Sequence, residues 1–344
     1  MRQLHLQSNT KVMKEKKIFI GIDVSKLTLD VYIHGVSDYF KVENNSQGFV
    51  KLLERIIQIT NTGKQDLFFC FEHTGKYSKL LSVFFHTEGL TFAMVPALQI
   101  KKSLGIARGK NDKVDAKRIA VYAYEKRESI KPTILPGEKV EELKSLLSLR
   151  EKLIKHRTAY MNGLTDLHDC YAEGENDLIK EVKLRMIDRL NEEITVVEKQ
   201  LLAIIKQDEG MNKNYKLITS VSGIGKVLGW YLIAYTANFQ QFSDARAFAC
   251  YAGIAPFENS SGKTFKPSRV NSIANKKIKT LLNMASLSVI QRRGEFQQYY
   301  EKRISEKGKN KMSTLNIIRN KIVFRVFAVI KRETPYVDLY KFAA

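Results

Sequence analysis

The sequence has few cysteines and no long hydrophobic run. Its three cysteines, Cys70, Cys170 and Cys250, are far apart and form no CxxC pattern. This spacing excludes a disulfide framework, argues against a thiolate zinc site and fits a reducing cytoplasm. No apolar run approaches the roughly 18–20 residues that cross a bilayer. The polar, basic residues 1–16 are not followed by the apolar stretch of a signal peptide. We therefore expect a cytoplasmic protein without a membrane partner.

Acidic residues are scarce beside basic ones. The 344 residues include 57 Lys and Arg but only 36 Asp and Glu, which gives a net charge of +21. The net charge is +8 over residues 1–130, −1 over residues 131–258 and +14 over residues 259–334. Such an excess is typical of proteins with a polyanionic partner, and its concentration in two regions favours a nucleic acid over a membrane surface.

Residues 17–130 predict an α/β domain. Apolar or alternating runs predict three strands in hairpin succession, and helices and strands then alternate. The predicted strands are 17–25, 27–35, 38–44, 66–74 and 91–96, and the predicted helices are 45–59, 76–89 and 111–126. This succession is typical of a ribonuclease-H-like sheet.

Residues 138–209, within a connector over residues 131–212, have almost no turn signals except near Gly174, so they predict a long helical hairpin. Apolar residues follow one another at spacings of three and four over about three heptads. They are Leu184, Ile187, Leu190, Ile194, Val197, Leu201 and Ile204. Such a seam can be buried inside one chain or between two chains. Because the segment is long, neutral and separates two basic regions, an intermolecular coiled coil is the favoured interpretation.

Residues 213–334 predict a third domain, mostly helical and interrupted by a Gly-, Pro- and Ser-rich loop over residues 251–268. Residues 1–16 and 335–344 are short tails. The sequence thus predicts a multidomain protein with a ribonuclease-H-like α/β domain, a helical coiled-coil connector and a mostly α C-terminal domain.

Two acidic residues stand in predicted buried strands. Asp23 lies within IFIGIDVS and Glu72 ends FFCFE, where a carboxylate is costly unless a cation or hydrogen bonds compensate it. Asp112 and Asp115 share one face at the start of a predicted helix. One such acid could simply cap a helix or pair with a lysine. Four converging carboxylates would repel one another without hard cations, so the set predicts a Mg²⁺ or Mn²⁺ site suited to phosphodiester chemistry.

The segment SVSGIGKVLGWYL places Gly223 and Gly225 between two apolar helical stretches. This resembles the hairpin of a helix-hairpin-helix DNA-binding element, in which backbone N–H groups at the start of the helix with Lys226 hold a phosphate. An ordinary turn between packed helices is the alternative. No GxxxxGK[ST] pattern is present, which excludes a nucleotide-binding P-loop.

A third pattern, AGIAPFENSSGKTFKPSR, places Ser260 and Ser261 close to Lys263, Lys266 and Arg269. Serine is a poor nucleophile unless its proton is removed or its alkoxide is stabilised. Neighbouring cations and a metal-bound phosphate could supply that help. Taken alone, SSGK is common loop chemistry, and none of the six histidines has the spacing of a triad with this loop.

Together the segments IFIGIDVSKLTLDVYI, FEHTGKYSKLL, KNDKVDA, SVSGIGKVLGWYLIAY and ACYAGIAPFENSSGK resemble the DEDD transposase family of bacterial insertion sequences, which includes site-specific DNA invertases. The resemblance extends from about Lys17 to Arg325. It implies a RuvC-like N-terminal domain, a coiled-coil connector and a C-terminal transposase domain with a nucleophilic serine. By this resemblance the protein binds donor and target DNA at the nucleoid, binds a guide RNA encoded by the element, and acts as a dimer or tetramer.

The resemblance also assigns site residues. It implies that Asp23, Glu72, Asp112 and Asp115 form the catalytic, metal-binding quartet, and that Ser261 is the nucleophile, with Ser260 as the alternative. The residues expected to contact nucleic acid are Gly223, Gly225, Lys226, Lys263, Lys266, Arg269, Lys276 and Lys277. One departure is Ala274, where related sequences commonly have glycine, so the turn geometry there is in doubt.

The sequence therefore predicts a DNA transposase or recombinase that cuts and rejoins DNA through a Mg²⁺-bound acidic quartet and a serine nucleophile. Two alternatives remain open. One is a metal-dependent nuclease or junction resolvase that uses water as its nucleophile. The other is a catalytically silent nucleic-acid-binding protein.

Overall fold

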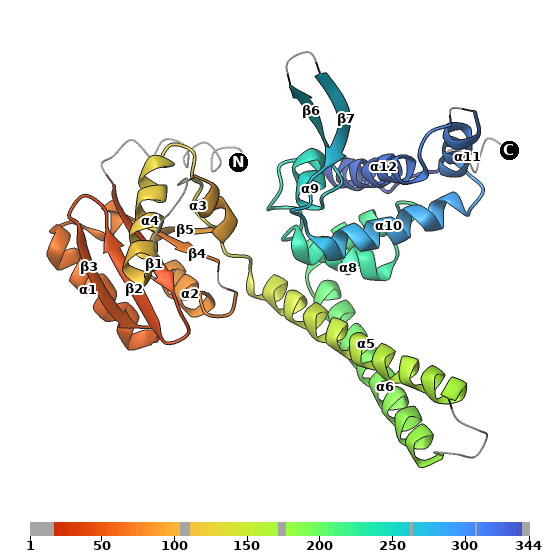
Figure 1. The fold of residues 1–344 in the computed structure, drawn as a ribbon, viewed down its shortest axis with the longest axis horizontal. Coiled ribbons are helices and arrows are strands. Elements are labelled where there is room, and N and C mark those ends of the chain that lie inside the picture. The colour runs from red at the N-terminus through yellow and green to blue at the C-terminus, as the bar shows by residue number, and fades with distance from the viewer. Residues whose placement is uncertain are drawn as a thin grey trace. The chain divides into compact units, whose positions relative to one another are not determined.

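The computed structural model describes residues 17–73, 75–103, 111–170, 177–261, 264–306 and 308–338. The chain divides into two compact units, residues 1–135 and residues 136–344 (Figure 1). The helical segment predicted as a connector belongs to the second unit from residue 136 onward. In the described part of the chain, no helix is long and apolar enough to cross a membrane.

The first unit is a five-stranded sheet covered by helices on both faces (Figure 1). The strands are β1 (Ile18–Val24), β2 (Thr28–Ile33), β3 (Asp38–Glu43), β4 (Leu67–Glu72) and β5 (Thr91–Val95). The helices are α1 (Ser46–Thr60), α2 (Lys79–Thr87), α3 (Ala97–Ser103) and α4 (Asp112–Glu125), with a short 3₁₀ turn η2 (Lys64–Asp66). The strand order is β3-β2-β1-β4-β5. The first three strands pair antiparallel, and β1, β4 and β5 pair parallel.

The predicted succession of strands and helices in this unit is confirmed, with ends that differ by a few residues. It gives the mixed α/β sheet that the sequence predicts. The helix α3 was not predicted, because it has only 7 residues and too few apolar positions to show a helical period.

Alternation along β1 decides which side chains face which helices. Ile20 and Ile22 lie in the apolar core with α1 and α2, together with Phe69 and Phe71 of β4. Phe19 lies in the core on the other face, where α3 and α4 pack. Odd-numbered residues of β1 therefore point toward α4.

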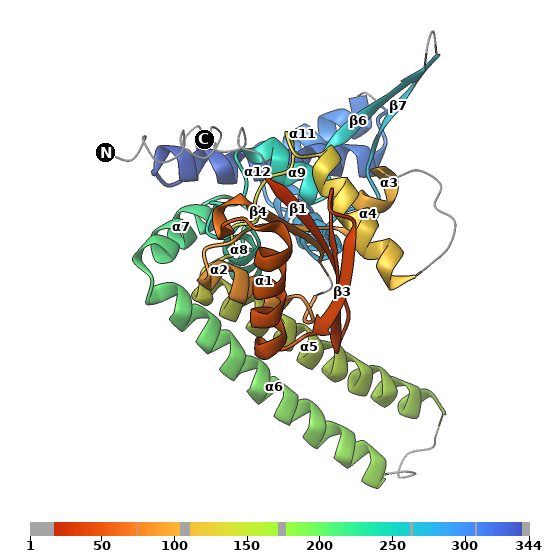
Figure 2. The same cartoon turned by 90° about the vertical axis from the view of Figure 1, so that its left-hand side faces the viewer.

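The second unit is mostly helical (Figure 2). Its helices are α5 (Glu138–Cys170), α6 (Asp177–Lys206), α7 (Glu209–Thr219), α8 (Lys226–Tyr235), α9 (Ala245–Tyr251), α10 (Lys276–Ile290), α11 (Glu295–Glu301) and α12 (Lys311–Arg332), with a π-helical turn η3 (Lys302–Glu306). The hairpin of β6 (Pro256–Ser261) and β7 (Thr264–Val270) stands between α9 and α10 in the sequence. One apolar core joins the inner ends of α5 and α6 to α7, α8, α9, α10 and α12.

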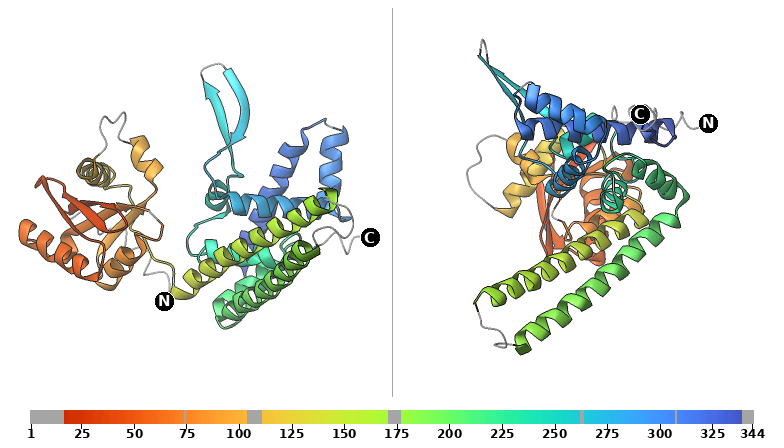
Figure 3. Two further views of the ribbon diagram at one scale, coloured as in Figure 1. Left: turned by 60° about the horizontal axis from the view of Figure 1, so that its bottom comes forward. Right: turned by 90° about the vertical axis from the view of Figure 1, so that its right-hand side faces the viewer.

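The predicted helical hairpin is present, and its seam is buried largely within the chain. α5 and α6 lie side by side (Figure 3). Leu190, Ile194 and Val197 are buried, whereas Leu184 toward the outer end is 44% exposed. This burial agrees with the internal helix pair, the less favoured alternative, because α5 supplies the opposing apolar face through residues such as Leu147. No coiled coil between chains is shown, and that interpretation stays a prediction.

The prediction of a loop over residues 251–268 is wrong for most of its length. An antiparallel hairpin pairs Phe257 with Arg269 and Ser261 with Thr264. Phe257, Thr264 and Phe265 favour strands. In the sequence this preference was masked by the Gly, Pro and Ser residues around them.

Candidate active site

Asp23 and Glu72 stand at the carboxyl ends of two neighbouring parallel strands. The register pairs Ile22 of β1 with Phe71 of β4, so the two acids follow side by side. Ile22 and Phe71 belong to the core with α1 and α2. The next residue along each strand faces the opposite side, so both carboxylates lie on the α4 face of the sheet.

Gly21 allows α4 to lie directly against β1. A Cβ atom there would stand 2.2 Å from the backbone N of Ala120 and 2.3 Å from the carbonyl oxygen of Ala116. These distances are far below van der Waals contact, so no larger residue fits without moving the helix. The glycine between the apolar residues of IFIGIDV thus sets how close the acids of α4 come to Asp23.

The first turn of α4 carries the other two predicted acids. The helix begins at Asp112, and the Asn111 side chain caps it by accepting a hydrogen bond from the Lys113 N–H at 3.0 Å. Asp115 follows one turn later on the same face. The cap therefore fixes the start of the helix and, with it, the place of both acids.

The four acids influence one another electrostatically. The pKa of Asp23 is raised to about 6, first by burial and then by the negative charges of Asp115, Glu72 and Asp112. Burial and Asp115 also raise the pKa of Glu72, against the opposing charge of Lys101. Excess negative charge on carboxylate oxygens is the donor chemistry that hard divalent cations require, so the residue types suit such a cation.

Two of these acids are paired with cations of the same unit. Arg118 Nη1 lies 2.9 Å from Asp115 Oδ1, and Lys41 Nζ lies 3.8 Å from Asp112 Oδ2. Among the described residues, no three His, Cys, Asp or Glu side chains are grouped as a ready metal site.

Asp30 is a fifth acid at this place, which the sequence analysis did not single out. It pairs with Asp23 across β1 and β2 and is 1% exposed. The Tyr39 hydroxyl donates a hydrogen bond to it at 2.6 Å, and Lys41 Nζ lies at 3.3 Å. This hydrogen bond, more than burial, raises the pKa of Tyr39 to about 12. The signal in the sequence was an acid inside the strand TLDVYI, the same signal as Asp23.

The predicted nucleophiles are in the second unit, at the end of β6. Ser260 pairs with Phe265 and Ser261 with Thr264 in the hairpin. Their side chains lie outside the described part of the chain, as do residues 262–263 with Lys263 and the side chain of Lys266. The exposed Arg269 follows in β7.

The predicted helix-hairpin-helix turn joins α7 to α8. Gly223 has φ +93°, a conformation that favours glycine, and packs against Val289 of α10. Gly225 precedes α8 and provides no side-chain cap for its first N–H groups. Lys226 Nζ lies 2.7 Å from Glu198 Oε2, so this cation already has a partner within the chain.

The basic start of α10 contains two lysines in different surroundings. Lys276 is exposed, whereas Lys277 Nζ lies 3.2 Å from Glu151 Oε1. Ala274 packs directly on Gly253, where an added Cβ would stand 2.2 Å from the Ala274 methyl carbon. The alanine at the position of the expected glycine is therefore accommodated by a glycine opposite.

A β3-β2-β1-β4-β5 sheet that gathers acids at the ends of its central strands is consistent with a nuclease-like domain of the DEDD type. Comparison with family models identifies the class more closely. A DEDD transposase model of the IS110 group matches residues 20–171, and the model of the transposase IS116/IS110/IS902 family matches residues 215–301. The chain belongs to this insertion-sequence transposase family and is by class a DNA transposase or recombinase.

The individual relatives are also gene-inverting or insertion-element proteins. The chain is 29% identical over 332 residues to the pilin gene-inverting protein of Moraxella lacunata, covering 93% of this chain and 98% of that protein. It is 27% identical over 204 residues to the transposase for insertion sequence element IS1111A of Coxiella burnetii, covering 52% and 54% of the two chains. A 44.8 kDa protein of insertion element IS116 from Streptomyces clavuligerus is 23% identical over 383 residues, covering 90% and 94%.

Proposed function

We propose that this protein cuts and rejoins DNA for an insertion sequence, with Asp23, Glu72, Asp112 and Asp115 as a catalytic Mg²⁺-binding quartet and Ser261 as the nucleophile. The observation that supports this most directly is that Asp23 and Glu72 follow the paired residues Ile22 and Phe71 on the α4 face of the sheet, where the other three acids of the proposed quartet, and Asp30, raise the pKa of Asp23. Mn²⁺ suits the same oxygen donors. Ser260 is the alternative nucleophile.

The carboxylates have distinct structural roles in this proposal. Asp23 and Glu72 are held by the sheet and would provide the fixed side of the site. Asp112 and Asp115 approach from α4, and Arg118 and Lys41 hold them until a metal binds. A bound Mg²⁺ would neutralise this charge and polarise the phosphoryl oxygens of the DNA.

The serine step conserves the energy of the phosphodiester. The Oγ of Ser261 forms a bond to phosphorus, and the bond from phosphorus to a neighbouring sugar oxygen breaks. The serine proton ends on that sugar oxygen, which leaves as a hydroxyl. Attack by a sugar hydroxyl on the phosphoserine link reverses the step and rejoins the strand.

Nucleic acid is the partner that the charge favours. We propose that the cations and turn glycines of the second unit hold donor and target DNA and a guide RNA encoded by the element, in a dimer or tetramer. The net charge of +21 supports a polyanionic partner. The exposed Lys276 and Arg269 support binding by this unit.

A metal-dependent nuclease that uses water is the second candidate. One observation favours it, namely that all four acids are in the first unit and both serines are in the second. The descriptions of the relatives, gene inversion and transposition, support strand exchange instead.

Trapping of a covalent complex tests the proposal. The wild-type protein, incubated with DNA of the element's end and Mg²⁺, should give a protein–DNA band that survives denaturation. Ser261→Ala should lose the band, Ser260→Ala should retain it, and Asp115→Asn should lose it as well. If both serine variants cleave DNA at the wild-type rate, the water-based nuclease replaces the serine mechanism.

A further inference from the structure

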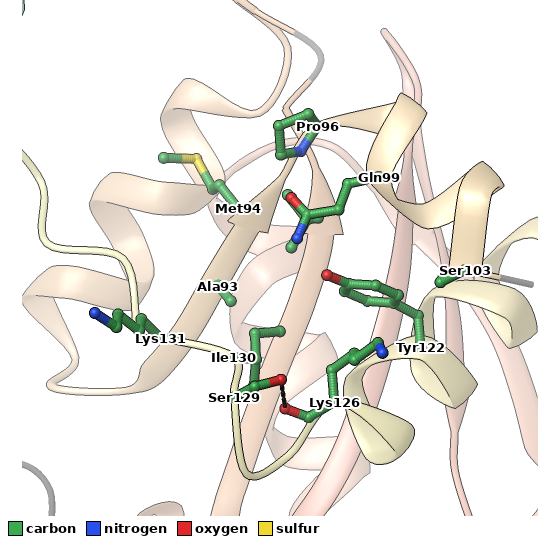
Figure 4. Close-up of a pocket in the computed structure, with 11 residues that line it drawn as sticks. Ala93, Met94, Pro96, Gln99, Ser103, Tyr122, Lys126, Ser129, Ile130 and Lys131 are labelled. Carbon is green, nitrogen blue, oxygen red and sulfur yellow. Dashed lines mark hydrogen bonds between the residues drawn. The ribbon is translucent and has the colours of Figure 1, made fainter. Parts of the chain in front are cut away.

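A hollow of about 530 Å³ lies on the α4 face of the sheet, beside the edge strand β5. Its lining comes from β5 and Pro96, from α3 and α4, and from the turn over residues 129–131. Figure 4 shows the side chains of Gln99, Tyr122 and Lys126 gathered around it, with Ala93 on the strand behind them. None of these groups takes part in the proposed chemistry.

The hollow adjoins the acidic site. The parallel register of β4 and β5 pairs Glu72 with Val95, and Val95 lines the hollow. Neighbouring strands are about 4.8 Å apart. A nucleic-acid strand bound at the carboxylates would therefore have this hollow one strand spacing away, on the same face of the sheet.

The lining combines an apolar surface with the polar groups of Gln99, Tyr122 and Lys126 and the hydroxyls of Ser103 and Ser129. Ala93, Val95, Pro96 and Ile130 supply the apolar surface, and no carboxylate of the described residues lines the hollow. Burial raises the pKa of Tyr122, while a hydrogen bond from Gln99 to its oxygen acts in the opposite direction. The Tyr122 O–H remains able to donate, and the Gln99 carbonyl remains able to accept.

This chemistry favours a flat ring with a polar edge. The volume lies within the range of small-ligand pockets and far exceeds that of one water molecule. A simple anion would use the ammonium groups of Lys126 and Lys131 and the lining hydroxyls, but it would leave the apolar surface of Ala93, Val95, Pro96 and Ile130 uncovered. A wholly apolar ligand would leave the Tyr122 O–H donor and the Gln99 carbonyl acceptor unused, because the bond between these two side chains involves only the Gln99 N–H and the Tyr122 oxygen.

We propose that the hollow receives one unpaired nucleobase of the strand whose neighbouring phosphate lies at the acidic quartet. The base packs on the apolar walls, Gln99 and Tyr122 form hydrogen bonds with its edge, and Lys126 contacts a carbonyl oxygen or phosphate. Enzymes that act on nucleic acids hold extruded bases in this way. The inference rests on the proposed function, because it needs a nucleic-acid strand at the acids.

Binding of single strands by the full-length protein tests this inference. The probes are 12-nucleotide DNA and RNA strands of one sequence and abasic strands of the same length, charge and sugar, with Ca²⁺ in place of Mg²⁺ as a hard cation for the acids that should not support cleavage. Fluorescence anisotropy should show that the wild-type protein binds the base-bearing strand of one sugar type about 10-fold more tightly than the abasic strand. The DNA and RNA probes show which strand supplies the base.

The double variant Gln99→Ala with Tyr122→Phe should reduce this base preference to about 2-fold or less. Tyr122→Phe retains the buried ring, so the fold should persist. The control is Tyr124→Phe, on the same helix but stacked on His34 with ring centroids 4.3 Å apart, and it should keep the full preference.

Other outcomes overturn the inference. If the double variant keeps the wild-type preference, or if the wild-type protein binds base-bearing and abasic strands equally, the hollow holds no base, although the proposed function stands. If the wild-type protein binds no strand at all, the proposed function fails together with this inference.

Discussion

Asp23, a proposed metal ligand, carries a charge that the folded protein opposes. Its carboxyl has an ordinary pKa of 3.8 and a pKa of about 6 in the folded protein, because burial and nearby acids oppose its charge. Between these values the folded state binds more protons than the unfolded state. The contribution of this group to the free energy of unfolding therefore falls as the pH rises from about 4 to about 6.

Asp23→Asn should raise the melting temperature at pH 7.5 in EDTA, because it removes a charge that the folded state opposes. The gain should disappear near pH 4, where the wild-type carboxyl is protonated. Scanning calorimetry at the two pH values measures the difference. The same variant should abolish recombination in Mg²⁺, because it loses a proposed metal ligand.

The exposed Glu54 of α1 provides the control for this comparison. Glu54→Gln also removes one carboxylate and should change neither the melting temperature nor recombination. An equal gain for Asp23→Asn at both pH values would mean that its charge is not opposed in the folded state.

Among the elements, α4 depends on close contact with β1. Gly21→Ala should push the helix outward, because the new methyl group would overlap the backbone of Ala116 and Ala120. We expect a loss of about 1–3 kcal/mol in the free energy of unfolding, and a larger proportional loss of recombination because two of the proposed ligands move. Chemical denaturation and a recombination assay measure both effects.

Gly137→Ala is the matched substitution, because nothing lies within 4 Å of an added Cβ there. It should leave stability and recombination near wild-type values. A Gly21→Ala protein with wild-type stability would show that α4 does not need this contact.

The seam of α6 offers two adjacent valines with opposite surroundings. Val197 is 7% exposed and Val196 is 59% exposed. Val197→Asp should destabilise the second unit by about 3 kcal/mol or more, because it buries a charge in an apolar core. Val196→Asp should change the stability by no more than about 0.5 kcal/mol.

Circular dichroism and sedimentation separate folding from assembly in these two variants. If Val196→Asp dissociates an oligomer without loss of helix, the exposed side of α6 contacts a second chain, as a coiled coil between chains requires. If Val197→Asp stays folded and only dissociates, the internal helix pair is wrong.

The sequence predicted what depends on local pattern. The strands around Asp23 and Glu72 were predictable because apolar runs and turns mark them, and the acids stood out against those runs. The contacts of Asp30 with Tyr39 and Lys41 depend on the register of β2 and β3, which no local pattern specifies. The sequence also could not decide whether the α6 seam packs on α5 or on a second chain, because the same apolar period is found in both kinds of packing.

At the scale of the whole molecule, the excess of basic residues should make nucleic-acid binding strongly dependent on salt. Each neutralised phosphate releases counterions and adds about −0.9 to the log–log slope for duplex DNA. The region 259–334 has a net charge of +14 and should provide a large share of this slope.

Two lysines at the start of α10 differ in their surroundings. They test whether exposed lysines contribute more to nucleic-acid binding than lysines that are already paired within the protein. Lys276 is exposed, whereas Lys277 is paired with Glu151 at 3.2 Å and lies over the Tyr231 ring, 5.6 Å from its centroid. Lys276→Ala should reduce the salt slope by about one and leave stability unchanged. Lys277→Ala should reduce the slope less and lower the melting temperature, because it also removes a contact of α5 and α8.

Anisotropy titrations on duplex DNA between 50 and 200 mM salt, together with thermal unfolding, distinguish the two variants. An affinity that does not change with salt would mean that this charge is not used to hold nucleic acid.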